Sequence, residues 1–290
     1  MAKSRRRERK PGLAKVNTDT RKASLPKQTA VDIQQSTLPD IIETEHRLAM
    51  TAAERYGEYY KHAEAATSFI SLFPKSVPPT LPIFARFWSL TKKHHLLALL
   101  STVRLHGTQA MMDLRQTLEA AVCAAFAIVH TDPALFADTT AVGTLDSSQA
   151  LSRRRYRWLD DNFPDASRYI KDHKDRINNS TAHANIVYTH RIFELRATEY
   201  NLPFFDIEDE YHTCTDLYTI GAIGISLMDL FYGVNDRHGR PVEFVEGFEQ
   251  RLLSLNAQSA ALQKEMLADP RSIALAQRIA ASERRDFKIE

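Results

Sequence analysis

Apolar residues recur every three or four positions along most of the chain after residue 40, which is the period of an amphipathic α-helix. The pattern predicts helices at 41–73, 83–130, 148–160, 165–182, 211–233, 242–267 and 270–286. The segment 83–130 is rich in Leu, Ala and Met, so it is expected to form one long central helix that bends near Gly107. Only nine glycines occur in the chain, which also favours helices.

Other patterns interrupt these helices. Four prolines lie in "PKSVPPTLP" (74–82) and end the first helix, while 131–147 is expected to be a loop. Residues 184–210 are rich in β-branched and aromatic residues, with Asn201 and Pro203 between the runs, so they predict a small β-hairpin. The expected fold class is therefore mainly all-α, a helical bundle with a small β-hairpin insertion.

Residues 1–40 differ from the rest of the chain in composition. They contain "KSRRRERK" and three prolines but few large apolar residues, so we expect a disordered leader. Residues 1–28 carry ten Lys or Arg and only two acidic residues, whereas the rest of the chain has a net charge of about −6. The leader is either a solvated tail or an arm that binds nucleic acid without sequence specificity. Residues 41–290 are then expected to form a single helical domain.

Composition also bears on the compartment. No apolar segment follows the basic leader, so a secretory signal is not indicated. The apolar run 217–228 is too short to span a bilayer and lies between two aspartates. The two cysteines, Cys123 and Cys214, are expected to be buried free thiols. These features predict a cytoplasmic protein that has no membrane partner.

The segment "RINNSTAH" (176–183) places polar residues at helical spacing. On a helix Arg176, Asn179 and His183 would form one polar stripe with Ser180 beside it. In "RQTLE", Arg115 and Glu119 are four residues apart and point the same way from the predicted central helix. If the two faces meet, the site would hold two guanidinium groups, a carboxylate, an imidazole and an amide.

Such a set of side chains suits cleavage of RNA. Arginine binds phosphate oxygens with two parallel hydrogen bonds, and histidine can transfer protons near neutral pH. RNA supplies its own nucleophile, the 2′-OH, so the reaction needs a base, an acid and cations that stabilise the phosphorane. No metal and no cofactor is therefore expected.

An Arg-x6-His motif late in an all-helical domain resembles the HEPN superfamily. "LRQTLEAAV" on the predicted central helix also looks like an element of HEPN-like bacterial domains, and the resemblance covers roughly residues 85–235. It implies a homodimer in which the two motifs face each other. Many members of the superfamily are metal-independent ribonucleases of toxin–antitoxin, phage-defence or RNA-processing systems, and others are non-catalytic interaction modules.

The sequence leaves alternatives open. HEPN motifs usually have a polar residue directly after the arginine, where this chain has Ile177. Arg176 and His183 could form a local surface pair, and Arg115–Glu119 could be an ordinary ion pair within one helix. His94, His95, His106 and His130 lack the spacing of a metal site. The acidic residues at 206–210 are expected to form a solvated turn or to cap the helix that follows.

Two functions from different classes follow. The first is a metal-independent endoribonuclease, in which His183 transfers the proton, Arg176 and Arg115 hold the phosphate, and Asn179 and Glu119 orient them. The second is a non-catalytic helical dimer that binds RNA or a protein such as an antitoxin. The cluster of Arg, Asn and His favours the first function, whereas Ile177 and the acidic body favour the second.

Overall fold

A computed structural model describes most of the chain after the basic leader. It covers residues 37–139, 142–143, 145–180, 189, 191–196, 199–201 and 203–286. Residues 1–36 of the leader and His183 lie outside the described residues. The last part of the predicted leader is helical, because α1 begins at Leu38. Thr37 caps this helix and exchanges hydrogen bonds with Asp40, a capping box that the sequence analysis missed.

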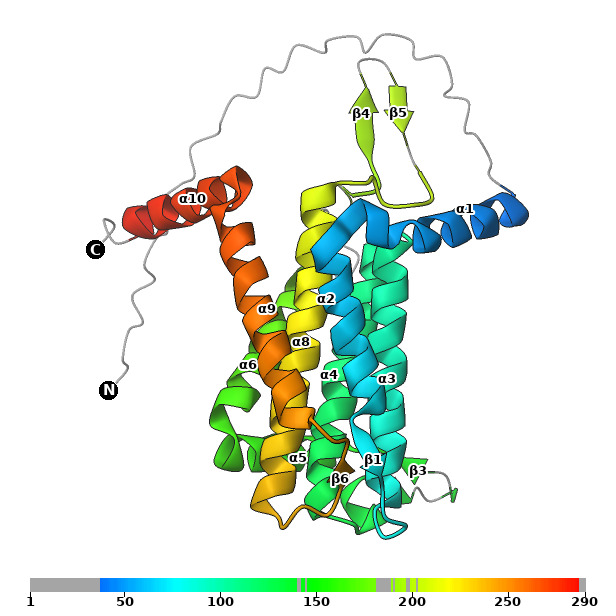
Figure 1. The fold of residues 1–290 in the computed structure, drawn as a ribbon, viewed down its shortest axis with the longest axis vertical. Helices are drawn as coiled ribbons and strands as arrows, with labels where there is room; N and C mark the ends of the chain where they lie inside the picture. The colour runs from blue at the N-terminus through cyan, green and yellow to red at the C-terminus, as the bar shows by residue number, and fades with distance from the viewer. Residues whose placement is uncertain are drawn as a thin grey trace, which may run out of the picture.

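The described chain forms a bundle of helices (Figure 1). The helices are α1 (Leu38–Met50), α2 (Ala52–Leu72), α3 (Pro82–Val103), α4 (Gly107–Val129), the 3₁₀ turn η1 (Pro133–Leu135), α5 (Gln149–Asn162), α6 (Pro164–Ser180), α8 (Glu210–Arg237), α9 (Phe248–Ala268) and α10 (Pro270–Asp286). The strands are β1 (Pro74–Ser76), β2 (Asp138–Thr139), β3 (Leu145–Asp146), β4 (Glu194–Arg196), β5 (Glu199–Asn201) and β6 (Glu243–Phe244). The expected mainly α-helical fold is confirmed.

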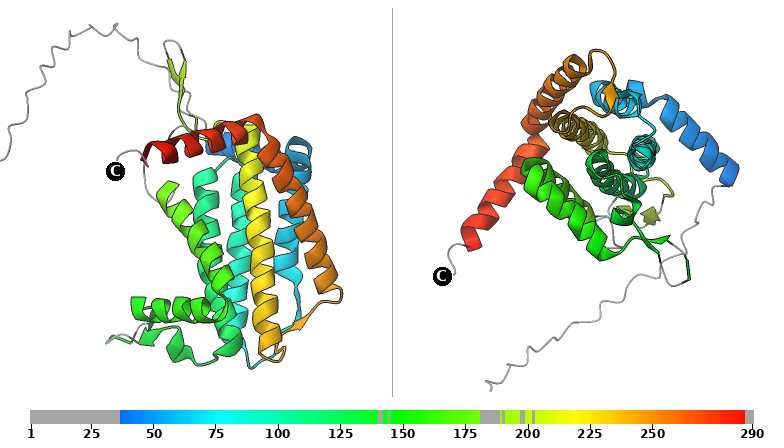
Figure 2. Two further views of the ribbon diagram at one scale, coloured as in Figure 1. Left: turned by 90° about the vertical axis from the view of Figure 1, so that its left-hand side faces the viewer. Right: turned by 90° about the horizontal axis from the view of Figure 1, so that it is seen from below.

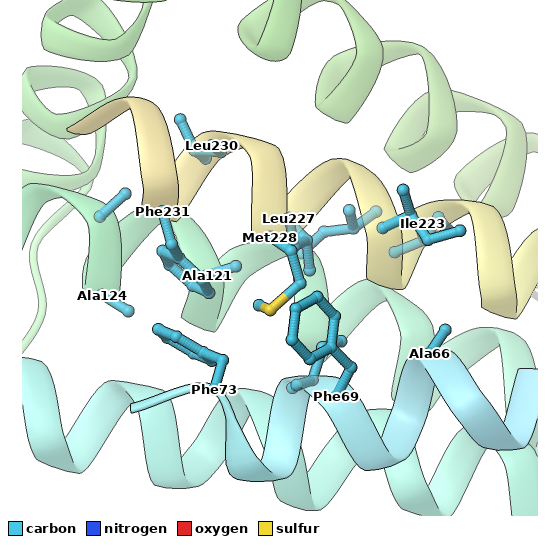
Figure 3. Packing of buried hydrophobic residues seen from close by; sticks show 14 of the residues in the cluster. Ala66, Phe69, Phe73, Ala121, Ala124, Ile223, Leu227, Met228, Leu230 and Phe231 are labelled. Carbon is cyan, nitrogen blue, oxygen red and sulfur yellow. The ribbon is translucent and has the colours of Figure 1, made fainter. Parts of the chain in front are cut away.

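The core lies between α2, α3, α4 and α8. Phe69 of α2 and Phe73, which directly follows α2, face Met228 and Phe231 of α8, as Figure 3 shows. The rings of Phe73 and Phe231 stack with their centroids 5.5 Å apart, and both side chains are fully buried. Alanines 121, 124, 125 and 127 line the buried face of α4, and these small side chains let the neighbouring helices approach closely.

The single long helix expected at 83–130 is wrong. The chain reverses between α3 and α4, which lie side by side in Figures 1 and 2. Leu105 in the connection has a φ of 62°, a left-handed conformation that ends the helical path. The carboxylate of Asp206 then accepts a hydrogen bond of 2.8 Å from the backbone N–H of Gly107, where α4 begins. A distant acidic residue therefore caps the second helix, which local periodicity could not reveal.

The helix expected at 41–73 is also two helices. It breaks at Thr51, whose hydroxyl donates a hydrogen bond of 3.0 Å to the carbonyl of Arg47. α2 contains a further kink at Gly57, which has a φ of 49° and a ψ of −124°. α1 has no buried residue and projects from the bundle (Figure 1).

α8 approaches α2 and α3 closely at two glycines. The imidazoles of His62 and His95 are fully buried and lie over Gly221 and Gly224 respectively. A Cβ atom on Gly221 would come within 2.5 Å of the His62 ring, and one on Gly224 within 2.9 Å of His95. The close contact at these glycines is thus made by histidine side chains from the neighbouring helices.

α8 is also long and apolar enough to cross a membrane by length and composition alone. In this structure 61% of its most apolar window is buried inside the bundle. The helix extends to Arg237, four residues beyond the expected end at 233. α8 is therefore mostly a core helix of the bundle.

The predicted hairpin between α6 and α8 is confirmed in its described part. β4 and β5 pair in antiparallel register, with Leu195 opposite Tyr200. Of the acidic residues before α8, Asp209 caps that helix by accepting a hydrogen bond of 3.2 Å from the N–H of His212. β1–β6 and β2–β3 are further two-stranded pairs, of which the first joins the end of α2 to the start of α9.

α5 and α6 form a helical hairpin on the side of the bundle (Figure 2, left). Pro164 starts α6 directly after α5, as its position between the two predicted helices suggested. Leu159, Ile170 and Ile177 are buried and form the apolar contact of the hairpin with the core. The remaining face of each helix is mostly polar, so the hairpin buries a narrower apolar stripe than the core helices do.

Candidate functional site

Arg115 and Glu119 lie on the side of α4 that faces the α5–α6 hairpin. Arg115 Nε is 3.4 Å from Glu119 Oε1, and each side chain is about one-third exposed, 31% and 36%. The two residues therefore form an ion pair within one helix, the ordinary alternative that the sequence left open. The pair is not solitary, however, because a third charged residue reaches it from α6.

Lys174 of α6 connects three helices. Its Nζ lies 3.0 Å from Glu119 Oε1 on α4 and donates a hydrogen bond of 2.7 Å to the hydroxyl of Tyr156 on α5. The ammonium also sits 4.6 Å from the centroid of the Tyr156 ring. Burial would lower the pKa of Lys174, but Tyr156 and Glu119 together raise it. The ammonium therefore stays charged, and Lys174 was missed because its partners lie on other helices.

The cluster of Arg115, Glu119, Lys174 and Tyr156 is already partly neutralised. The carboxylate of Glu119 lies between two cations, in the position that a bound phosphate would need. Burial raises the pKa of Tyr156, so its phenol stays protonated at neutral pH and cannot serve as a base. The arrangement thus suits the docking of α6 on α4 better than catalysis.

Cys123 of α4 lies beside the same cluster. Burial raises the pKa of its thiol, although the nearby Arg155 opposes this effect. Arg155 is itself only 6% exposed and donates hydrogen bonds to the carbonyl of Leu135 and to the hydroxyl of Ser147. Cys123 is therefore a neutral thiol and not an activated nucleophile. Both cysteines are free, and both are partly rather than fully buried.

Arg176 lies on a different flank of α6 from Lys174. Two residues along an α-helix correspond to about 200° of rotation. Because Lys174 points to α4, Arg176 points away from it. Burial and, to a lesser extent, the charge of Arg176 lower the pKa of His173 to about 4, which places the guanidinium near that imidazole. The structure therefore does not bring Arg176 to the pair formed by Arg115 and Glu119.

The rest of the "RINNSTAH" segment is only partly described. α6 extends to Ser180, so Arg176 and Asn179 lie on a helix as expected, and both are exposed. Ile177, the apolar residue after the arginine, is 4% exposed and packs in the contact with the core. A polar residue at this position would be buried. The position of His183 lies outside the described residues.

The outer face of α5 carries a basic patch that the sequence analysis overlooked. Arg153, Arg154 and Arg157 are exposed and lie within about one turn of each other. None of the three forms an ion pair with an acidic residue in the described ranges of the chain. Like charges three or four residues apart destabilise a helix by about 0.2–0.5 kcal/mol per pair. A helix that carries three such arginines is suited to contact an anion from outside the protein.

The charge of the α5–α6 hairpin contrasts with its surroundings. Residues 149–180 contain eight Lys or Arg and five Asp, whereas residues 203–286 contain eight Lys or Arg and fourteen acidic residues. The sequence "SRRRYR" (152–157) was a visible signal for this patch. The net negative charge of the chain after the leader hides this local basic patch.

Comparisons with known proteins found no match: no family model, no curated protein and no solved structure matches this chain. The site is therefore interpreted from its own geometry.

Proposed function

We propose that the protein is an RNA-binding helical module, the second of the two functions that the sequence suggested. The observation that carries this proposal is the outer face of α5, where Arg153, Arg154 and Arg157 are exposed and have no acidic partner in the described ranges. Three guanidinium groups on one helical face match the repeated phosphates of a nucleic-acid backbone. RNA is the expected nucleic acid because of the HEPN resemblance.

The geometry of the α4 cluster does not favour cleavage there, which leaves binding on α5 as the better-supported function. Glu119 there occupies the space between Arg115 and Lys174, and Arg176 points to another flank of α6. The contact with RNA would thus be electrostatic and insensitive to sequence, and it would weaken as salt is added.

Binding is tested with the triple variant Arg153→Gln, Arg154→Gln and Arg157→Gln in the full chain, measured by fluorescence anisotropy with a labelled 20-nucleotide RNA. The expected loss is about tenfold to a hundredfold at moderate salt, and the slope of log affinity against log salt should fall by about two to three. The leader is unchanged in this variant, so the loss reports on α5.

The matched control removes three exposed cations elsewhere, Arg86 and Lys93 on α3 and Lys264 on α9. These residues change the net charge equally but do not form one cluster of three, because Lys264 lies on a different helix from Arg86 and Lys93, so affinity should fall by less than about threefold. Equal losses in the two variants would attribute the binding to net charge, and unchanged affinity of the α5 variant would refute the proposal. Single- and double-stranded DNA of equal length test the preference for RNA.

A ribonuclease remains the second candidate, and one observation favours it. Arg176 is exposed on α6, seven residues before His183, so the arginine half of the motif is at the surface. If the motif is catalytic, His183→Ala should lower the cleavage rate by about 10²–10⁴ in EDTA and leave the fold intact. Arg176→Lys should restore only part of the activity lost in Arg176→Ala, because lysine lacks the bidentate fork.

The products should carry 2′,3′-cyclic phosphate ends if the 2′-OH is the nucleophile. If the wild-type protein binds RNA and leaves it uncut, with or without divalent metal, the ribonuclease is refuted and binding remains as the only proposed function. The motif pairs of HEPN proteins further suggest a homodimer. Light scattering at micromolar concentration should then give twice the chain mass of 33.0 kDa, and a monomer would argue against a shared site.

A further inference from the structure

A pocket at one end of the bundle combines aromatic rings with carboxylates. It has a volume of about 420 Å³ and lies where α8 ends and β6 leads into α9. Tyr232, Phe244 and Phe248 line it, and their ring centroids are 4.6–6.3 Å apart. Tyr232 and Phe244 are half-buried, so the rings form a wall that is open to a ligand.

Exposed carboxylates lie beside these rings. Asp236, Glu243 and Glu249 line the pocket, and Glu246 lies in the same short segment between β6 and α9. Arg240 pairs with Asp236 at 2.8 Å, and Lys75 pairs with Glu243 at 2.7 Å.

Two of the four carboxylates form no ion pair in the part of the chain that the structure describes. Within the described ranges neither Glu246 nor Glu249 forms an ion pair, although Arg240 lies close enough to Glu249 to interact with its charge. Glu249 also accepts a hydrogen bond of 2.8 Å from the Tyr232 hydroxyl. The pocket therefore keeps uncompensated negative charge beside aromatic faces.

This chemistry selects a guanidinium group. Arginine stacks its plane on an aromatic face and donates paired hydrogen bonds to a carboxylate. Arg240 shows the carboxylate part of this chemistry, because its Nε and a terminal nitrogen lie 2.9 Å and 2.8 Å from Asp236 Oδ1 at the rim of the pocket. A neutral or anionic ligand would leave Glu246 and Glu249 without a partner.

The chain contains a ligand of this kind in its own leader. Residues 5–10 read "RRRERK", and residues 1–28 carry ten Lys or Arg against two acidic residues. α1 starts at the opposite end of the bundle from β6 (Figure 1). α8, which runs along the bundle, is about 42 Å long at 1.5 Å per residue. The 26 residues between Lys10 and Thr37 can extend about 90 Å, so residues 5–10 can reach the pocket.

We propose that the basic segment 5–10 docks, within the same chain, into the pocket formed by Tyr232, Phe244, Phe248 and the surrounding carboxylates. An arginine of the segment stacks on the aromatic wall, and the cations beside it pair with Glu246 and Glu249. The docked segment is a second cationic element of the protein, and it is held at the end of the bundle where α5 also lies (Figure 1).

The test places a photo-crosslinking residue, p-benzoylphenylalanine, at Gln250, an exposed position on the rim of the pocket. The full chain is irradiated without RNA, and the crosslinked peptides are identified by mass spectrometry. The expected product joins position 250 to residues 3–15. An equal mixture of isotopically light and heavy chains should give products whose two peptides carry the same label.

Charge-reversal variants then test the chemistry. Glu246→Lys with Glu249→Lys should lower the yield of this product about tenfold, whereas Glu54→Lys with Glu64→Lys on the exposed side of α2 should leave it unchanged. Circular dichroism checks that each variant is folded. Replacing Arg5, Arg6, Arg7 and Arg9 by Gln provides a second test that leaves the pocket intact and should lower the yield equally.

The proposal is overturned by three results. These are the absence of crosslinks to the leader, a yield that is insensitive to both sets of substitutions, and products that join light to heavy chains, which would assign the pocket to a second copy. Because no RNA is present, none of these results depends on the RNA-binding function.

Discussion

The core helices and the α5–α6 hairpin belong to one bundle, but different interactions hold them. The core buries aromatic rings, alanines and two imidazoles between α2, α3, α4 and α8. The hairpin docks through a narrow apolar contact, together with Lys174, which joins α6 to Glu119 and Tyr156. The core determines stability, whereas the hairpin carries charge on its exposed side and holds it at a fixed place. Experiments that perturb one region and leave the other intact test this division.

The largest effect is expected from the aromatic centre of the core. Phe231→Ala should lower the free energy of unfolding by about 3–5 kcal/mol, because a fully buried ring is replaced by a cavity. Ile177→Ala in the hairpin contact should cost less global stability and should mainly speed amide exchange in α5 and α6. Denaturant unfolding and hydrogen exchange measure the two effects. Equal exchange in both regions of the Ile177 variant would show that the hairpin does not open separately.

The buried imidazole of His95 should make the core sensitive to acid. Burial lowers the pKa of His95 to about 4 from an ordinary value of 6.5, although a hydrogen bond with the carbonyl of Ile220 opposes this effect. Between these two pH values the unfolded chain binds a proton that the folded chain does not. Stability is therefore fully present above pH 6.5 and falls as the pH falls towards 4, by about 3 kcal/mol for this group.

The measurement is the free energy of unfolding between pH 7 and pH 4. His95→Gln should flatten the profile, whereas His46→Gln on the exposed side of α1 should not. Burial also lowers the pKa of His62, which will keep some of the slope in the His95 variant. An unchanged profile in the His95 variant would contradict the assignment.

Two glycines of α8 offer a matched pair. Gly221→Ala places a Cβ within 2.5 Å of the His62 ring, which is fully buried and cannot move aside, so a loss of about 1–3 kcal/mol is expected. Gly233→Ala meets only Phe163, at an ordinary contact distance of 3.5 Å. That variant should gain up to about 1 kcal/mol from helix propensity. Thermal unfolding of both variants measures the difference, and similar melting temperatures would show that α8 does not need the glycine at 221.

The smallest effect is expected at the polar contact of the hairpin. Lys174→Met keeps the aliphatic stem but removes the partner of Tyr156 and one partner of Glu119, so a loss of roughly 1 kcal/mol is expected. Lys171→Met is the control, because its pair with Asp160 is about half exposed on both sides and contributes little. Denaturant midpoints at low and high salt compare the two variants, and a larger loss at Lys171 would reverse the assignment.

The candidate site shows how far local patterns extend. "RQTLE" correctly placed Arg115 and Glu119 on one helical face, and "RINNSTAH" placed Arg176 and Asn179 on another helix. The sequence could not show that Lys174, rather than Arg176, is the residue of α6 that reaches Glu119. That choice depends on which side of α6 is buried, and Ile170 and Ile177 determine it through their contacts with other helices.

The sequence by itself determined the helical fold class, the hairpin between α6 and α8 and the boundary between the helices at 148–160 and 165–182. Each of these follows from helical periodicity or from turn-forming residues, which act within a few residues along the chain. Only the tertiary structure decided that the chain reverses at Leu105. Asp206, which lies 99 residues after Gly107, caps α4 there, and α3 and α4 bury their apolar faces against each other and α8. Periodicity records which face of a helix is apolar, but the partner of that face is selected by packing.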